Sequence, residues 1–131
     1  MLIIGAKGFA KEVLEVCHQT KQLDGLAFYD DVNNDVLGLL YDKFPVIKSM
    51  EEAQNYIENT DNRFNIGIGG PRLREMLYHK FLNVGGVFVS LIAESSVIGH
   101  YANSIGIGCN IMQKVVITNN VTIGKGVIIN Q

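Results

Sequence analysis

The chain has 131 residues, which allows one ordinary domain or two small ones. Its net charge of −2 gives no reason to expect nucleic acid or an anionic membrane surface as a partner. We expect a cytoplasmic protein without a membrane span, because no apolar run is long enough to cross a bilayer, the N-terminus lacks the features of a signal peptide, and two cysteines fit a reducing compartment.

The chain opens with a predicted strand, a glycine-containing turn and a helix. Residues 2–4 are apolar, the turn runs from Gly5 to Phe9, and apolar residues then recur at helical spacing, namely at Ala10, Val13, Leu14 and Cys17. This order is typical of a nucleotide-binding βα unit, in which the first amides of the helix face an anion. The dinucleotide motif G-x-G-x-x-G is absent, and Gly5-x-x-Gly8 alone is equally consistent with a plain tight turn.

A second strand is predicted over residues 26–29, and it ends in Asp30 and Asp31. Open α/β sheets bind their ligands at the carboxyl ends of the strands. The two carboxylates can therefore accept hydrogen bonds from a ribose or from the N–H of a base. A plain polar loop is the alternative, because more Asn and Asp residues follow directly.

The middle of the chain predicts one more strand and a helix. Residues 44–47 form the strand, and Pro45 predicts an edge position because proline has no N–H for a neighbouring strand. Ser49 followed by Glu52 is a capping box, so a helix is expected from there to about Glu58.

A third strand-to-helix unit follows. Residues 64–68 predict the strand, and Gly69, Gly70 and Pro71 lead into a helix that starts at the proline and is suited to bind a phosphate. Arg74 lies in the first turn, as does Arg72, where a cation opposes the helix dipole. This slightly favours an anion-binding role for one of the two, while a solvated surface arginine remains the more common case. With a last strand over residues 87–92, residues 1–90 predict a small parallel sheet covered by helices.

The last third of the chain carries a six-residue repeat. Isoleucine recurs every six residues, at Ile105, Ile111, Ile117, Ile123 and Ile129, and a small apolar residue follows four positions after each of the first four. This period fits neither an amphipathic helix nor a long alternating strand. It predicts short strands joined by turns and stacked as a parallel β-helix, with an ordinary β-meander as the alternative. Cys109 occupies one of the inward positions and is expected to be a buried hydrophobe.

No catalytic or metal-binding arrangement is apparent from the residues. His79 is expected on a helix surface and His100 in a turn, and neither has a nucleophile or a set of metal ligands near it in the sequence. The sequence therefore predicts no catalytic residue and no metal site within these 131 residues.

A small Rossmann-like domain followed at once by hexapeptide repeats resembles one family over the whole chain. This is the family of sialic acid O-acetyltransferases and UDP-4-amino-sugar N-acetyltransferases, which are acyltransferases with a left-handed parallel β-helix. The turn from Gly5 to Ala10 is similar to the family's G-A-x-G-H-A turn, Tyr29-Asp30-Asp31 to its acidic pair, and Ile68-Gly69-Gly70 with Arg74 to its I-G-N-x-x-x-R segment.

The resemblance implies two domains and their ligands. Residues 1–90 would bind a nucleotide sugar, and residues 91–131 would begin the β-helix that binds acetyl-CoA between the subunits of a homotrimer. The substrate-binding residues implied are Gly5, Ala6, Lys7, Gly8, Phe9, Asp30, Asp31, Gly69, Gly70 and Arg74. Phe9 stands where many members carry histidine, and Gly70 stands where many carry asparagine, so the resemblance does not identify the sugar.

The resemblance implies that the catalytic residue lies beyond Gln131, the last residue of this sequence. In the family, a histidine on the coil after the segment that matches Ile129-Asn130 acts as the general base. The hexads from Ile105 make only about one and a half coils, whereas solenoids need roughly three or more repeats. We therefore expect the substrate-binding part of a longer sugar acetyltransferase, inactive by itself. The alternatives are a non-catalytic nucleotide-sugar-binding or trimerisation module and, less favoured without G-x-G-x-x-G, an NAD-binding domain.

Overall fold

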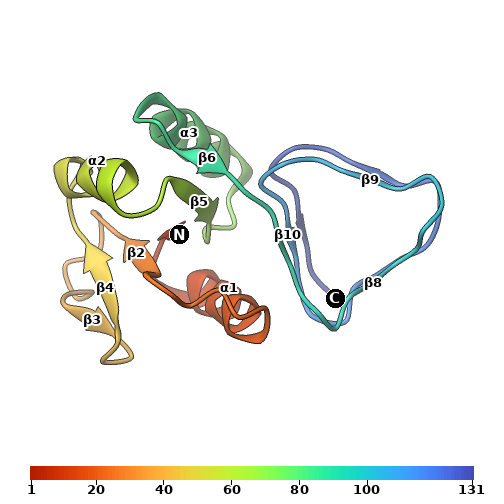
Figure 1. Cartoon of the computed structure of the whole chain (residues 1–131), viewed down its shortest axis with the longest axis horizontal. Coiled ribbons are helices and arrows are strands. Elements are labelled where there is room, and N and C mark those ends of the chain that lie inside the picture. Colours follow the sequence, from red (N-terminus) through yellow and green to blue (C-terminus); the bar gives the residue numbers. More distant parts are fainter.

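The computed structural model describes residues 1–131 as two adjoining parts, an α/β part and a triangular coil (Figure 1). The α/β part contains the strands β1 (Leu2–Ile4), β2 (Ala27–Tyr29), β3 (Leu39–Leu40), β4 (Phe44–Ile47), β5 (Arg63–Ile66) and β6 (Val87–Phe88). Its helices are α1 (Gly8–Gln19), α2 (Met50–Asn59) and α3 (Pro71–Asn83). None of these helices is long and apolar enough to cross a membrane.

The six strands form one sheet in the order β3-β4-β2-β1-β5-β6, and every pair except β3–β4 is parallel. The side chains of β1 alternate between two buried clusters, because successive residues of a strand point to opposite faces. Ile3 packs with α1, whereas Leu2 and Ile4 pack with α2 and α3. Helices thus cover both faces, which confirms the predicted parallel sheet with helices packed on it.

The structure corrects the predicted place of Pro45. Residue Leu39 of β3 pairs with Pro45 in an antiparallel register, so β4 has neighbours on both sides and is not the edge of the sheet. Pro45 has no N–H to donate, and the amide of Val46 makes the bond to the β3 side instead, to the Gly38 carbonyl at 2.9 Å. The two-residue strand β3 lacks the length and alternation by which a strand is found in a sequence.

Ser49 is the N-cap of α2, as the predicted capping box requires, and the bond from its hydroxyl to Glu52 Oε1 takes the place of the reciprocal backbone bond. The hydroxyl of Ser49 accepts a hydrogen bond from the amide of Glu52 at 3.2 Å, and α2 begins at the next residue after Ser49. Two glutamates in the first turn, Glu51 and Glu52, also suit the positive end of the helix dipole.

The C-terminal third is a parallel β-helix, as the hexads predict. Its strands are β7 (Leu91–Ile92), β8 (Val97–Ile98), β9 (Ser104–Ile105), β10 (Asn110–Ile111), β11 (Val116–Ile117), β12 (Thr122–Ile123) and β13 (Ile128–Ile129). They form three parallel sheets, β7-β10-β13, β8-β11 and β9-β12, which are the three sides of the triangle in Figure 1. One hexad therefore supplies one side, and three hexads supply one coil.

The interior of the β-helix is filled by the repeating positions. Cys109, Ile111, Val115, Ile117 and Ile123 form one buried cluster. A second contact joins the β-helix to the α/β part, because Leu91, Ala93 and Met112 are buried in the same cluster as residues of α1. The two parts are thus packed together through apolar side chains.

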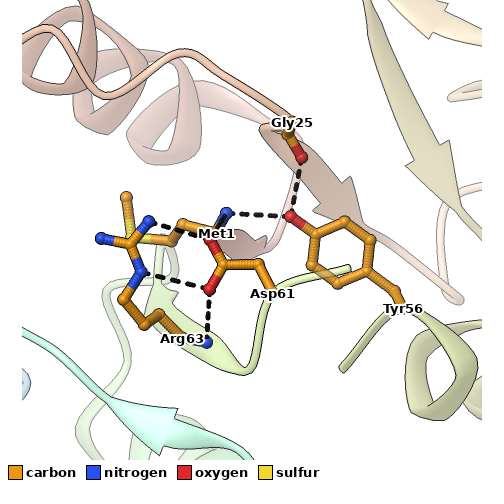
Figure 2. A network of polar contacts seen from close by, with 5 residues as sticks. All are labelled: Met1, Gly25, Tyr56, Asp61 and Arg63. Carbon is orange, nitrogen blue, oxygen red and sulfur yellow. Dashed lines mark hydrogen bonds and ion pairs between the residues drawn. The ribbon is translucent and has the colours of Figure 1, made fainter. Parts of the chain in front are cut away.

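The amino group of Met1 belongs to a polar network at the amino ends of β1, β2 and β5 (Figure 2). The Met1 ammonium group donates to Asp61 Oδ2 at 2.7 Å and to the Tyr56 hydroxyl at 2.9 Å. The Tyr56 hydroxyl donates to the Gly25 carbonyl at 2.7 Å, and Arg63 donates to both oxygens of Asp61. Burial raises the pKa of Tyr56 to about 12, and the charge of Asp61 adds to this increase.

Changing Asp61 to asparagine is expected to destabilise the fold by about 1–3 kcal/mol at pH 7, because its charge-assisted hydrogen bonds are lost. Hydrogen bonds from Arg63 and the ammonium group hold the pKa of Asp61 well below its usual range, although burial acts in the opposite direction. A carboxylate whose pKa is lower in the folded state stabilises the fold above the unfolded-state pKa, near 3.9, and loses this effect as pH falls. Urea denaturation at pH 7 and pH 3.5 checks this.

Because pH 3.5 is below the unfolded-state pKa but above the folded-state pKa of Asp61, the difference in unfolding free energy between the parent chain and Asp61→Asn should be slightly smaller there than at pH 7, and it should decrease further as the pH is lowered. Asp24→Asn is the matched control, since Asp24 is exposed and makes no polar contact through its side chain. A difference that stays constant with pH would contradict the assigned role of Asp61.

Candidate functional site

A cavity of about 450 Å³ lies over the carboxyl ends of β1, β2 and β5. The chain runs from β1 towards β2 and β4 on one side, and then crosses to β5 and β6 on the other. The strand order therefore reverses between β1 and β5, and such reversal points are where open α/β sheets bind ligands. We refer to it as the switch-point cavity. Its lining consists of residues 4–7, residues 29–33, Gly67 and Ile68, and the α3 residues Leu73, Met76, Leu77 and Lys80.

The floor of the switch-point cavity depends on Gly5. Its φ of +106° lies in the region that L side chains avoid. A Cβ atom there would also stand 2.8 Å from Ile68 Cγ1 and 2.9 Å from the Gly67 carbonyl oxygen. Only glycine allows the loop after β1 to lie this close to the loop after β5.

The N-terminus of α1 opens near the same cavity. Lys7 is the N-cap residue, and its side chain makes no capping hydrogen bond, so the first amides of α1 remain available to an anion. The Lys7 ammonium group instead pairs with Asp35 at 2.6 Å. Nothing lies within 4 Å of the position where a Cβ of Gly8 would stand, which leaves the start of the helix open to a ligand.

The two aspartates after β2 have different roles in the structure. Asp30 is buried and accepts hydrogen bonds from the amides of Val32 and Asn33 and from the Asn33 side chain. Burial raises its pKa, but the bonds from Asn33 and Val32 lower it more, so the net pKa is below the usual value. Asp30 therefore holds the loop, and its oxygens are largely engaged.

Asp31 is exposed at the mouth of the switch-point cavity. Its Oδ2 accepts a hydrogen bond from the Tyr29 hydroxyl at 2.9 Å and lies 3.8 Å from the Lys80 ammonium group. Burial and the bond to Asp31 both raise the pKa of Tyr29. Oδ1 of Asp31 makes no hydrogen bond, so this carboxylate can accept one from a ligand.

A second cavity, of about 530 Å³, lies between α3 and the last coil of the β-helix. We refer to it as the interface cavity. From the α/β part it is lined by Gly69, Pro71, Arg74, Glu75, Tyr78, His79 and Phe88, and from the β-helix by residues 125–128. The interface cavity therefore has one wall in each part of the molecule.

Arg74 is a buried cation whose hydrogen bonds join the two parts. It donates within the α/β part to the carbonyls of Ile66 at 2.6 Å and Ile68 at 3.0 Å. Across to the β-helix it donates to the carbonyl of Gly126 at 3.0 Å and to Asn110 Oδ1 at 3.1 Å. The remaining N–H of Arg74, on Nη2, donates to the carbonyl of Gly108 at the longer distance of 3.4 Å. No carboxylate pairs with it, and burial lowers its pKa.

The sequence predicted one substrate-binding set, but in the structure its members do not all line the same cavity. Gly5, Ala6, Lys7, Asp30 and Asp31 line the switch-point cavity, whereas Gly69 and Arg74 line the interface cavity. Gly8, Phe9 and Gly70 line neither, and Phe9 packs against the apolar cluster on the α1 face of the sheet. The geometry gives Arg74 no free donor for an anion.

Sequence reasoning missed the contribution of α3 to the switch-point cavity. Leu73, Met76 and Lys80 line it, and Met76 is 56% exposed although it lies at an apolar position of the helical pattern. Val32, on the loop after β2, is 78% exposed at the same cavity. Exposed large apolar side chains around a concave site are a sign of ligand contact, but only the structure shows that they are exposed.

Comparison with known proteins gives one family and several similar structures. The family model of the PglD N-terminal domain matches residues 1–81. No curated protein sequence matches the chain significantly. Among solved structures, PerB from Caulobacter crescentus, in complex with CoA and GDP-perosamine, aligns with a TM-score of 0.85 and 30% sequence identity over 99% of this chain and 59% of its own.

Two further structures have the same arrangement. A mutant of the perosamine N-acetyltransferase from Caulobacter crescentus, also with CoA and GDP-perosamine, has a TM-score of 0.86 and 28% identity over 99% of this chain and 59% of its own. The acetyltransferase domain of PglB from Neisseria gonorrhoeae FA1090, in complex with acetyl coenzyme A, has a TM-score of 0.84 and 25% identity over 99% of this chain and 60% of its own. The chain therefore spans about three fifths of the relatives that it matches.

Proposed function

The chain belongs to the family of PglD N-terminal domains, and from this membership we propose that it is the nucleotide-sugar-binding part of an acetyl-CoA-dependent sugar N-acetyltransferase. The observation that carries the proposal is the switch-point cavity, with the close turn at Gly5 and the free carboxylate oxygen of Asp31, in a chain that continues directly into β-helix coils. The similar structures that contain CoA with GDP-perosamine support it.

In this proposal the switch-point cavity holds the nucleotide. Asp31 accepts a hydrogen bond from a ribose hydroxyl or a base N–H, and the apolar side chains of Val32 and Met76 contact the base. The diphosphate lies towards the free amides at the start of α1, where the helix dipole and unpaired N–H groups favour negative charge.

We further propose that the two parts of the chain, which meet at about residue 90, have different ligands. Residues 1–90 bind the nucleotide sugar, and residues 91–131 begin the β-helix, on which the family binds acetyl-CoA in a homotrimer.

The general base is proposed to lie beyond Gln131, which is exposed and follows β13 by two residues. Within this chain His18, His79 and His100 are all exposed, and none makes the side-chain hydrogen bond that would orient it as a base, although His79 lines the interface cavity. We therefore expect this chain by itself to bind substrate without transferring acetyl groups.

Calorimetric titration of the 131-residue chain with GDP and with UDP tests the proposal. At least one of the two should bind saturably, and Asp31→Ala should weaken binding about tenfold or more, because a hydrogen bond to a charged group is lost. Asp24→Ala is the control, since Asp24 is an exposed aspartate in the turn between α1 and β2. Saturable binding of NAD without binding of either nucleoside diphosphate would contradict the proposal.

A further inference from the structure

Each charged side chain that lines the switch-point cavity has a partner within the protein. The cavity contains two cations and two carboxylates, namely Lys7, Lys80, Asp30 and Asp31. Lys80 lies 3.8 Å from Asp31, and Asp30 accepts hydrogen bonds from backbone amides. Lys7 differs from these, because its ion pair is with Asp35, a residue that does not line the cavity. A carboxylate from outside the cavity thus engages one of the two cations inside it.

Lys7 is placed to bind a phosphate group. It is the N-cap residue of α1, so its side chain starts where the free amides of the helix begin. The first turn of α1 contains no acidic residue that could pair with it. An ammonium group beside free amides suits a phosphate, because the cation adds a point charge to the field of the helix dipole. In the structure that ammonium group binds a carboxylate oxygen instead, Asp35 Oδ2, at 2.6 Å.

The loop that carries Asp35 is held in place by other contacts. At its start, Asp30 accepts a hydrogen bond from the amide of Asn33 at 2.8 Å. The Lys48 ammonium group donates to the carbonyls of Asn33 and Val36, at 2.8 Å each. The Val36 side chain also packs against the apolar cluster on the α1 face of the sheet. We therefore expect the loop to keep its position when Asp35 loses its charge.

The ion pair between Lys7 and Asp35 is suited to exchange. The two side chains are 50% and 73% exposed, so water competes for both groups. Exposed ion pairs are weak, because solvent screens the charges and two flexible side chains must be held in one geometry. A diphosphate has more than one negative charge and can accept hydrogen bonds from the helix amides as well. It is therefore a stronger partner for Lys7 than a single carboxylate is.

We propose that Asp35 is an internal competitor for the diphosphate of the nucleotide sugar, which occupies Lys7 in the ligand-free protein and is displaced when the diphosphate binds. This inference rests on the function proposed above and adds to it a residue that weakens binding. A ligand that engages Lys7 must first break the ion pair, so part of its interaction with the ammonium group is lost. Removing the charge of Asp35 should therefore strengthen nucleotide binding, which is the opposite of the effect expected for Asp31.

Calorimetric titration of the 131-residue chain with GDP and with UDP, at about 20 mM salt so that ion pairs are little screened, tests this inference. For the nucleotide that binds, Asp35→Asn should raise the affinity about two- to fivefold, the range expected for an exposed ion pair. Lys7→Met should lower the affinity about fivefold or more, because a charge-assisted contact to the phosphate is lost. In the double variant the gain from Asp35→Asn should disappear, since no ammonium group is left to release.

A second measurement follows the ion pair in the unaltered chain. The hydrogen bond from Lys7 lowers the pKa of Asp35. Titration of the Asp35 carboxyl group by carbon-13 NMR should therefore show a pKa below the ordinary aspartate value in the free chain. Saturation with the nucleotide should raise this pKa, because the ammonium group leaves the carboxylate. A pKa that does not rise on saturation means that the ion pair persists, and it overturns the inference.

Asp42→Asn is the matched control, and it should leave the affinity unchanged. Asp42 is exposed in the same connection between β2 and β4, and its side chain makes no hydrogen bond or ion pair. The inference is also overturned if Asp35→Asn binds the nucleotide no tighter than the parent chain, or if its gain persists in the Lys7→Met background. Such results leave nucleotide binding in the switch-point cavity intact. Absence of binding by both GDP and UDP overturns the proposed function itself, and this inference with it.

Discussion

Replacing Arg74 with methionine should lower the free energy of unfolding by about 3–5 kcal/mol, because it leaves several buried hydrogen-bond acceptors without a donor. Methionine keeps a long apolar stem but removes all the bonds that join α3 to Asn110 and to the carbonyl of Gly126. Asn110 is fully buried and also donates to Asn65 Oδ1 at 2.7 Å, so its carbonyl oxygen cannot turn to water. We expect the α/β part and the β-helix to unfold less cooperatively as a result.

Urea denaturation followed by circular dichroism at about 222 nm, together with hydrogen exchange of the β-helix amides, measures both effects. Arg72→Met is the matched control, because Arg72 lies in the same first turn of α3 but is exposed and makes no polar contact through its side chain. If Arg74→Met is no less stable than Arg72→Met, the hydrogen bonds of Arg74 do not stabilise the contact between the α/β part and the β-helix.

Replacing Gly108 with alanine should destabilise the chain by about 3–5 kcal/mol, since overpacking a rigid core adds to the cost of a left-handed backbone. The φ of Gly108 is +70°, and a Cβ atom would stand only 2.0 Å from Cε2 of Phe88. The Phe88 ring is 5% exposed and stacks on Phe64 with centroids 5.0 Å apart. It therefore cannot move away without disturbing the core of the α/β part.

Gly38→Ala separates the cost of the left-handed backbone from the cost of the contact with Phe88. Gly38 has a φ of +71°, almost the same as Gly108, but no atom lies within 4 Å of its would-be Cβ. Its replacement should therefore cost only about 1–2 kcal/mol, the penalty for the left-handed conformation. Equal losses in the two variants, measured by urea denaturation, would show that Phe88 does not hold the β-helix turn in place.

The helices, the capping box and the coils of the β-helix could be predicted because their signals are local. Ser49 and Glu52 are three residues apart, and the isoleucines of the hexads are six apart, so each pattern reports a structure that forms within a few neighbouring residues. The antiparallel pair at Pro45 could not be predicted, because β3 has only two residues and carries no periodic signal.

The candidate site was predictable only in part, for the same reason. The turn at Gly5 and the aspartate at Asp31 follow strand ends directly, and parallel strands bring their carboxyl ends to one edge of a sheet, so sequence order suffices to place them. Lys80 lies in the last turn of α3, and its position at the cavity depends on how α3 packs over the sheet. No pattern within α3 contains that information.

The sequence by itself determined the α/β order, the hexads and the family resemblance, because turn chemistry and the spacing of apolar residues act over short distances along the chain. Only the tertiary structure decided what Arg74 does. Its position in the first turn of a glycine-marked helix suggested an anion as its partner, yet its donors go to carbonyl and amide oxygens, including those of Asn110 and Gly126, 36 and 52 residues away. A buried guanidinium group bonds to whatever acceptors packing brings around it, and that packing is a property of the two parts together.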